Sequence, residues 1–355
     1  MSTAPAIDQD RLMSFLFKVV NDFGSSLSMT TALIGDRLGL YRAMRDGGAM
    51  DSKELAAKTG TSERYIREWL INQAAGGYVE YDPKTAKFTL PPEQAFALAD
   101  EDSPVNLCGG FQLMSAMAKA DERITHAFKT GEGMGWGEHH HDLFTGTERF
   151  FRASYLGHLV NDWIPALDGV KDKLERGAKV ADVGCGHGAS TIIMAKAFPR
   201  SRFHGFDLHA PSIARANEAA REAGLSDRVT FEASDAATWS GGDYDLVCFF
   251  DCLHDLGEPT AACRRAYAAL RPGGTLMVVE PMAGRTLEEN LNPVGRLFAG
   301  ASVMCCTPNA LATGGHALGT IATDDALQGV AMGGGFASLT RATETPFNRV
   351  FTTKR

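Results

Sequence analysis

A glycine-rich turn directly after an apolar stretch is the strongest chemical signal in this sequence of 355 residues. Val180–Val183 has the character of a buried strand, Gly184–Gly188 reads G-C-G-H-G, and Ala189–Ala195 has the pattern of a helix. Glycines let such a turn approach a ligand where a Cβ would clash. Parallel α/β sheets bind ligands at this edge, beyond the carboxyl ends of their strands. The turn therefore predicts a ligand site.

The spacing of the glycines separates two kinds of ligand. A dinucleotide fingerprint has the spacing G-x-G-x-x-G, whereas this chain has G-x-G-x-G, with Asp182 two residues before the first glycine. Asp207 ends the next apolar stretch, where a carboxylate can accept hydrogen bonds from both hydroxyls of a ribose. The alternative is that Asp207 and Asp235 only cap helices. A nicotinamide-dependent oxidoreductase is disfavoured by this spacing.

A histidine follows the fourth predicted strand. Leu246–Phe250 leads into Asp251–Leu256, which reads D-C-L-H-D-L. An imidazole near its ordinary pKa can take a proton from a hydroxyl or amine at neutral pH, so His254 is the candidate general base. The alternative is that His254 caps a helix and that Glu280, which ends the fifth strand, pairs with an arginine.

Strand and helix patterns alternate from Gly177 onward, which predicts a doubly wound, Rossmann-like α/β sheet that is mostly parallel. Two final apolar stretches, separated by Thr345-Pro346, predict an antiparallel hairpin at its edge. The expected strands are Lys179–Val183, Arg202–Phe206, Val229–Glu232, Leu246–Phe250, Thr275–Val279, Ser338–Arg341 and Asn348–Thr352.

The N-terminal part has the pattern of a winged helix. Two short helices begin at Asp51 and Thr61, and a hairpin pattern follows at Tyr78–Tyr81 and Lys87–Leu90. Between Asp51 and Trp69 there are four basic and four acidic residues, so the second helix has no net positive face for a phosphate backbone. We therefore predict a role in forming a homodimer and shaping the substrate site, not in binding nucleic acid.

The acid-x-G-x-G-x-G pattern ending at Gly188 resembles motif I of class I S-adenosylmethionine-dependent methyltransferases. The His254-Asp255 pair and Glu280 resemble those of winged-helix small-molecule O-methyltransferases, although Leu256 stands where plant-type members have Trp. Over nearly its full length the chain looks like an actinobacterial and mycobacterial group of winged-helix methyltransferases, mostly of unassigned substrate. Four segments carry that likeness: Leu253–Asp255, Glu280–Gly284, Asn290–Arg296 and Arg341–Asn348.

The resemblance implies transfer of a methyl group from S-adenosylmethionine to a small molecule, with O- or N-methylation favoured. It places Asp182 at the methionyl end, Asp235 at the adenine amino group, and Glu280 where it orients His254. The expected catalytic residues are His254 and Glu280. The expected cofactor site is Asp182, Gly184, Gly186, Gly188, Asp207, Leu208, Ser234, Asp235, Ala236 and Phe250, and the expected substrate pocket is Trp136, Phe151, Tyr155 and His254.

Bulk properties limit the remaining possibilities. The net charge of −8 argues against nucleic acid as the main partner, and no apolar stretch reaches the roughly 20 residues that span a bilayer. Seven cysteines without Cys-x-x-Cys pairs, and no secretory signal pattern, favour reduced thiols in the cytoplasm. No metal site is expected, because the consecutive histidines His139–His141 cannot all face one ion.

We expect three parts: a winged-helix and dimerisation domain (1–105), a helical connector and lid (106–165), and a catalytic domain (166–355). A ligand-sensing transcriptional regulator with a methyltransferase-like effector domain is the alternative from another functional class.

Overall fold

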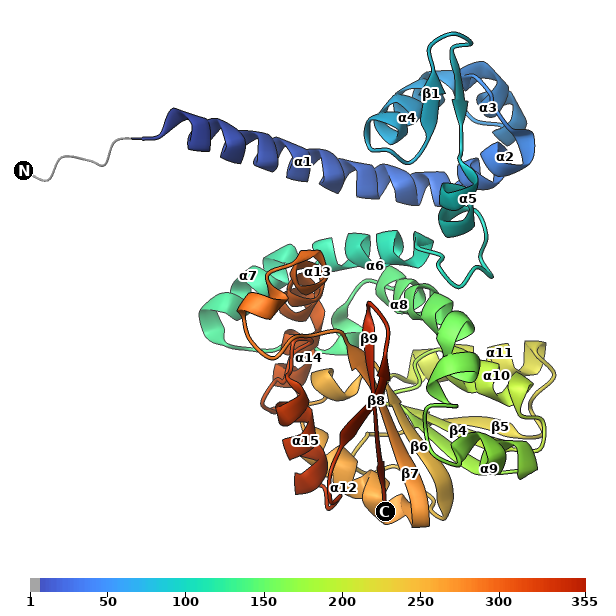
Figure 1. Cartoon of the computed structure of the whole chain (residues 1–355), viewed down its shortest axis with the longest axis vertical. Coiled ribbons are helices and arrows are strands. Elements are labelled where there is room, and N and C mark those ends of the chain that lie inside the picture. Colours follow the sequence, from blue (N-terminus) through green and yellow to red (C-terminus); the bar gives the residue numbers. More distant parts are fainter. Residues whose placement is uncertain (1–6) are drawn as a thin grey trace, which may run out of the picture. The chain divides into compact units, whose positions relative to one another are not determined.

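The computed structural model describes residues 7–355, which divide after Ser115 into two compact units. In the first unit, two short helices and a two-stranded hairpin form the expected winged helix (Figure 1). Its elements are α1 (Gln9–Arg37), α2 (Leu40–Gly47), α3 (Ser52–Thr59), α4 (Glu63–Ala75), β1 (Glu80–Asp82), β2 (Lys87–Thr89) and α5 (Pro92–Leu98). The predicted domain limits at 105 and 165 stay predictions.

Local sequence explains where the helix-turn-helix begins and turns. The Asp51 carboxylate accepts from the backbone N–H groups of Lys53 and Glu54, and the Glu54 carboxylate accepts from the Asp51 N–H, which completes a capping box. Gly60, at φ 65°, ends α3 in the left-handed conformation that favours glycine. Apolar side chains including Tyr41 and Leu70 then bury a core of their own.

Charged side chains of α3 and α4 form ion pairs, two within α4 and one between α3 and β2. Arg67 donates to Glu63, Arg64 pairs with Glu68, and the Lys87 ammonium lies 3.0 Å from the Glu54 carboxylate. These pairs leave the second helix without the net positive face that binding to a phosphate backbone requires. The absence of a nucleic-acid partner stays a prediction.

The second unit contains a seven-stranded sheet in the order β5-β4-β3-β6-β7-β9-β8. β3 to β7 run parallel, and β9 lies antiparallel to β7 and β8, which confirms the predicted fold class. The strands are β3 (Lys179–Val183), β4 (Arg202–Asp207), β5 (Val229–Ala233), β6 (Tyr244–Phe250), β7 (Leu270–Pro281), β8 (Thr340–Glu344) and β9 (Asn348–Lys354).

Alternate side chains of the strands bury two separate cores, one on each face of the sheet. Val180 and Leu246 belong to one core, whereas their neighbours Ala181 and Val247 belong to the other. α10 (Ala189–Ala197) and α11 (Ala210–Glu222) cover the first face, and α12 (Pro259–Ala269) and α15 (Asp324–Gly333) cover the second (Figure 1). The smaller α9 (Val170–Arg176) packs with the first core.

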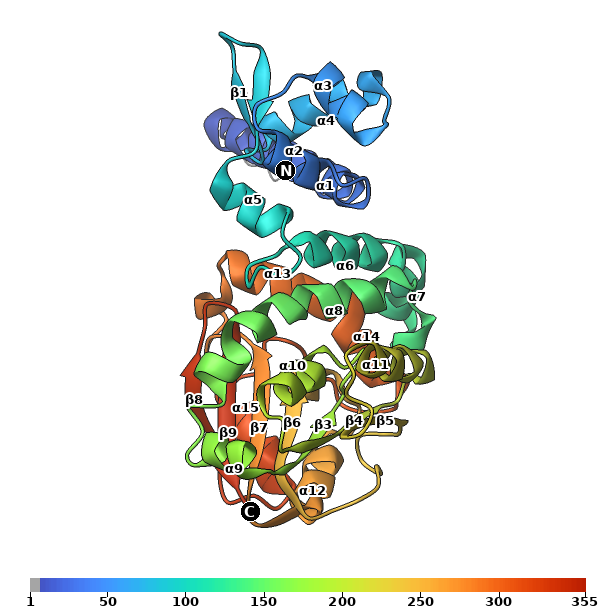
Figure 2. The same cartoon turned by 90° about the vertical axis from the view of Figure 1, so that its right-hand side faces the viewer.

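Several helices lie beyond the carboxyl ends of β3, β6 and β7 (Figure 2). They are α7 (Asp121–Thr130), α8 (Asp142–Ser154), α13 (Pro293–Ala301) and α14 (Thr307–Ala312). The division after Ser115 falls within α6 (Cys108–Ala118). α8 continues as a π-helix over Tyr155–Trp163, and a π-helical turn, Ser302–Cys306, joins α13 to α14. No helix of the described residues is long and apolar enough to cross a membrane.

Candidate active site

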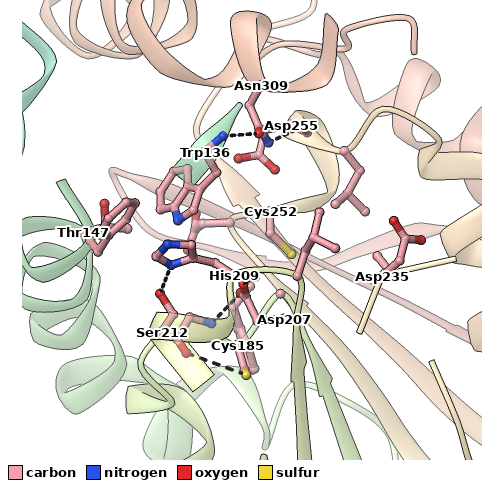
Figure 3. Close-up of a pocket in the computed structure, with 18 of the residues that line it drawn as sticks. Trp136, Thr147, Cys185, Asp207, His209, Ser212, Asp235, Cys252, Asp255 and Asn309 are labelled. Atoms are coloured by element: carbon pink, nitrogen blue, oxygen red, sulfur yellow. Dashed lines mark hydrogen bonds between the residues drawn. The ribbon is translucent and has the colours of Figure 1, made fainter. Parts of the chain in front are cut away.

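The strand order reverses between β3 and β6, and a cavity of about 560 Å³ opens at their carboxyl ends. Ligands of doubly wound sheets bind at such a switch point. Figure 3 shows side chains that converge on the cavity from the strand ends, the loop before α8, and the segment around α14. Of the residues expected for cofactor and substrate, Trp136, Phe151, Tyr155, Gly184, Gly186, Asp207, Leu208, Ser234, Asp235, Ala236 and Phe250 line it.

The three glycines of the turn have positive φ angles but serve different purposes. A Cβ on Gly184 would lie 2.6 Å from the Cys252 sulfur, and a Cβ on Gly188 would lie 2.5 Å from the Phe231 ring. Gly186 has no atom within 4 Å of its Cβ position and lines the cavity. Gly188 does not line the cavity, so its role is packing between the turn and the sheet.

The Asp207 carboxylate is held at the end of β4. One of its oxygens accepts from the Gly186 N–H and the other from the His209 N–H, each at 2.9 Å. Burial raises the pKa of Asp207 above its ordinary value. Asp235 is exposed and accepts from the Ala237 N–H at 2.7 Å, so it stabilises its own turn as well as lining the cavity.

Asp182 lies beneath the glycine turn and does not line the cavity. Its Oδ2 accepts from the hydroxyls of Ser190 and Thr191, at 2.6 and 2.5 Å, which ties the strand to the first turn of α10. Its Oδ1 is buried without a hydrogen-bond partner. Burial raises the pKa of Asp182 to about 6. A buried carboxylate with an unused acceptor suits a cationic ligand near it.

His254 and Glu280 form a buried pair. The His254 Nδ1 lies 2.6 Å from Glu280 Oε2, and the His254 N–H donates to Oε1. Their side chains are 4% and 1% exposed. Burial opposes protonation of the imidazole, but the Glu280 carboxylate outweighs it and raises the pKa of His254 well above its ordinary value. The partner of Glu280 is thus the histidine, and neither residue lines the cavity.

The titratable group beside His254 that faces the cavity is Asp255. Burial raises the pKa of Asp255 to about 7, against the opposing effect of His254. Asn309, from α14, connects Asp255 to Trp136. Its side-chain amide donates to the backbone carbonyl of Asp255 at 3.0 Å and accepts from the backbone N–H of Trp136 at 2.9 Å (Figure 3). Asn309 was not predicted, because a single asparagine outside any motif gives no sequence signal.

Asp251 is a second cavity residue that sequence reasoning missed. It has φ 51°, a left-handed conformation that few non-glycine residues adopt. Asn348 donates to its Oδ1 at 2.9 Å and the Tyr155 hydroxyl lies 3.4 Å from Oδ2. Burial, with the nearby Glu280 charge, raises the pKa of Asp251 well above its ordinary value. Its position between the end of β6 and His254 was the sequence signal that could have identified it.

Aromatic rings form part of the cavity wall. Trp136 lies 5.7 Å from Phe144 between ring centroids, and Phe144 lies 4.3 Å from His209. Tyr155 lies 5.5 Å from Phe250 at the end of β6. All five rings line the cavity, so the predicted substrate-pocket aromatics lie together with two that were not predicted.

The histidine run ending at His141 lies outside this wall. The Lys119 ammonium is within 3.3 Å of both His140 ring nitrogens and 3.2 Å from the Asp142 carboxylate. The His139 ring is buried. A positive side chain therefore already occupies the region where a cation would bind.

This fold and this site define a class: a Rossmann-like nucleoside-binding domain with a glycine turn after its first strand and a fixed acid after its second. Comparison with known proteins gives the family of each part. Residues 174–322 match a family described as a methyltransferase domain, and residues 25–100 match an Rv2258c-like winged HTH domain. The chain thus carries an S-adenosylmethionine-dependent methyltransferase domain behind a winged helix-turn-helix domain.

Two curated relatives match the catalytic part. A 27-O-demethylrifamycin SV methyltransferase of Amycolatopsis mediterranei is 31% identical over 131 residues, which are 35% of this chain and 48% of that protein. A trans-aconitate 2-methyltransferase of Variovorax paradoxus is 36% identical over 110 residues, or 30% and 40% of the two chains. The chain therefore spans less than half the length of either of these relatives.

Solved structures match the chain almost end to end. A putative O-methyltransferase from Nostoc punctiforme superposes with a TM-score of 0.72 at 19% identity, covering 99% of this chain and all of that one. Human N-acetylserotonin methyltransferase in complex with S-adenosylmethionine has a TM-score of 0.71 at 16% identity, covering 99% of each chain. At these identities the likeness shows the fold.

Proposed function

We propose that this protein transfers a methyl group from S-adenosylmethionine to a small-molecule acceptor, at oxygen or nitrogen. One observation supports this most: a single cavity joins the glycine turn and Asp207 on one side to an aromatic wall and Asp255 on the other. A donor and an acceptor held in one such cavity would meet in a fixed geometry, which is the chief requirement of methyl transfer.

The residues on the donor side fit the donor. The Asp207 carboxylate is held in place by two backbone N–H groups and still has lone pairs for the ribose hydroxyls, and Gly186 leaves open space beside it. The unpartnered Oδ1 of Asp182 suits the positive methionyl end, and Asp235 suits the adenine amino group. When bound, the donor supplies an electrophilic methyl group on a positively charged sulfur.

The charge of the lining restricts the acceptor. Among the described residues that line the cavity there is no lysine or arginine. Besides Asp207 and Asp235, four carboxyl groups line it: Glu148, Asp251, Asp255 and Glu258. A carboxylated or phosphorylated acceptor would therefore enter without a lysine or arginine to pair with it. We therefore expect a neutral or cationic acceptor with an aromatic or apolar body.

His254 is the proposed base, and the geometry suggests how a proton would reach it. Glu280 holds Nδ1, so the proton that His254 takes up and releases is the one on Nε2. Because its pKa is raised, His254 acts as a base only after it has released that proton. Because His254 lies behind the cavity wall, we place Asp255 between it and the acceptor: a ring nitrogen and a carboxylate oxygen of the two lie within 4.8 Å. Asp255, with a pKa of about 7, can exchange a proton at neutral pH.

The long N-terminal helix supports the proposed homodimer. Its exposed apolar side chains recur at steps of three and four residues from Met13 to Leu27, followed by one step of seven to Ile34, which is the spacing of a coiled-coil seam with Thr30 at one position. They are Met13, Leu16, Val20, Phe23, Leu27 and Ile34, with 45–66% of each residue exposed. A second copy of the helix would bury this stripe in a self-complementary contact.

The donor half is tested by calorimetry with S-adenosylmethionine. We expect Asp207→Asn to weaken binding at least tenfold, about 1.4 kcal/mol, and Asp227→Asn, an exposed aspartate away from the cavity, to leave it unchanged. No binding to folded wild-type protein free of co-purified S-adenosylhomocysteine would refute the proposal.

The acceptor half is tested by turnover of matched pairs, a phenol or aryl amine against the same ring bearing a carboxylate. Preference for the uncharged or cationic member is expected. Faster methylation of the carboxylated member would contradict the charge argument.

A further inference from the structure

Three potential metal ligands converge behind the cavity wall. His254 and Asp255 lie in the short turn after β6, and Cys306 ends the π-helical turn before α14. One ligand atom from each lies within 4.8 Å of the other two. We propose that these three side chains form a Zn²⁺ site, and that the bound ion withdraws His254 from proton transfer and so inhibits the enzyme.

The donor set favours zinc over magnesium or calcium. A thiolate and an imidazole are ligands for zinc and related transition metals, whereas magnesium and calcium prefer oxygen alone. Three protein ligands also leave a tetrahedral ion one position for water. Asp255 lines the cavity while His254 and Cys306 are buried, so the proposed site lies at the cavity wall.

Glu280 orients His254 as a ligand. Zinc-bound histidines usually donate their second ring N–H to a carboxylate, which fixes the tautomer and the ring orientation. Here Glu280 accepts from Nδ1 at 2.6 Å, so the contact between His254 and Cys306 involves Nε2. The same arrangement that prepares a base therefore prepares a metal ligand.

The π-helical turn determines which cysteine takes part. Cys305 and Cys306 are both buried, but only Cys306 belongs to the three-residue cluster. π-helical turns often occur at functional sites. The Cys305 side chain contacts the Cys306 thiol but is not one of the three ligands. The same substitution at Cys305 therefore offers a control that changes the surroundings of Cys306 without removing a ligand.

The other candidate cluster has a weaker claim. His140, His141 and Asp142 also bring ligand atoms together, but the Lys119 ammonium lies 3.2 Å from the Asp142 carboxylate and contacts His140. A metal ion there would have to displace a lysine. The side chains that interact with Cys306 are Cys305 and His254, and neither is a lysine or arginine.

Metal binding is tested first, without reference to turnover. Full-length protein stripped with a chelator is titrated with Co²⁺, whose thiolate charge-transfer absorption reports a sulfur ligand, and with Zn²⁺ in competition with a chromophoric chelator. We expect one equivalent to bind with a thiolate band. Cys306→Ser should lose the band and weaken Zn²⁺ binding at least tenfold, and Cys305→Ser should retain both. S-adenosylmethionine binding serves as the folding check.

Three results would overturn the site: no thiolate band in the wild type, unchanged Zn²⁺ affinity in Cys306→Ser, or equal losses in the two cysteine variants. The inhibitory effect rests on the proposed function and has its own test. Zn²⁺ should lower turnover over the concentration range in which it binds, a chelator should restore it, and Cys306→Ser should resist it. Binding without inhibition would refute the withdrawal of His254. Because the metal titration needs no turnover, it tests the site even if the protein proves not to be a methyltransferase.

Discussion

Replacing Asp182 by asparagine should stabilise the protein while weakening its hold on the donor. The Asp182 carboxylate is buried, and its pKa rises from an ordinary value of 3.8 to about 6. At 1.36 kcal/mol per pKa unit, keeping the group charged costs the folded state about 3 kcal/mol at pH 8. Asparagine can still accept from the Ser190 and Thr191 hydroxyls through its own oxygen, and it carries no charge.

The sign of the pH dependence follows from proton binding. Between pH 4 and pH 6 the folded protein holds the Asp182 proton while the unfolded chain releases it, so the wild type loses stability as the pH rises through this window. The advantage of Asp182→Asn should therefore grow from about 1.5 kcal/mol at pH 5 to about 3 kcal/mol at pH 8. Below pH 4 it should disappear.

Urea unfolding at pH 5, 6 and 8 measures this difference, and calorimetry measures donor binding by the same variants. Asp245→Asn is the control, because Asp245 is a partnered carboxylate: it accepts from the Lys179 N–H at 2.8 Å and pairs with Arg271. That variant should gain no stability at any pH. A stability difference for Asp182→Asn that does not change from pH 5 to pH 8 would refute the buried-charge argument.

Three further predictions concern the base, the helix seam and the glycine turn. His254→Ala should lower turnover at least a hundredfold with donor binding retained by calorimetry; an unchanged rate would remove His254 from the mechanism. Phe23→Glu places a charge in the exposed stripe of α1 and should shift a dimer to monomer in analytical ultracentrifugation, whereas persistence of the dimer would place the interface elsewhere. Gly184→Ala forces a Cβ to within 2.6 Å of the Cys252 sulfur at φ 77°, so thermal unfolding should show a loss of about 1–3 kcal/mol. Cys252→Ala should restore part of that loss, because it removes the sulfur and leaves the contact of 2.9 Å with the Cβ of residue 252; no recovery would show that the sulfur contact is not a cause of the loss.

Much of the sheet could be predicted because apolar runs between turn residues identify buried parallel strands. β3 begins and ends where the sequence predicts, and β4 is one residue longer. β7 begins at Leu270, five residues before the predicted Thr275. That extension passes through a glycine pair and a shift in register with β6, where no apolar pattern marks a strand.

The cofactor side was more predictable than the acceptor side for a physical reason. The glycine turn and Asp207 are fixed by local backbone geometry, which leaves a readable spacing. The positions of Asn309 and Asp251 depend on contacts across the fold, with Trp136 and with Asn348. Sequence spacing also could not show that His254 turns toward Glu280 behind the wall.

The surplus of carboxylates in the cavity has a consequence for the end of the catalytic cycle. Transfer of the methyl group converts a positively charged sulfonium into a neutral thioether, while the carboxylates around it, with no lysine or arginine among the described lining residues, stay in place. The attraction that holds the donor is therefore lost at the moment of reaction. Such a pocket would release the spent cofactor and bind fresh donor readily. The ratio of its affinity for the donor to its affinity for the product should decrease as salt is added.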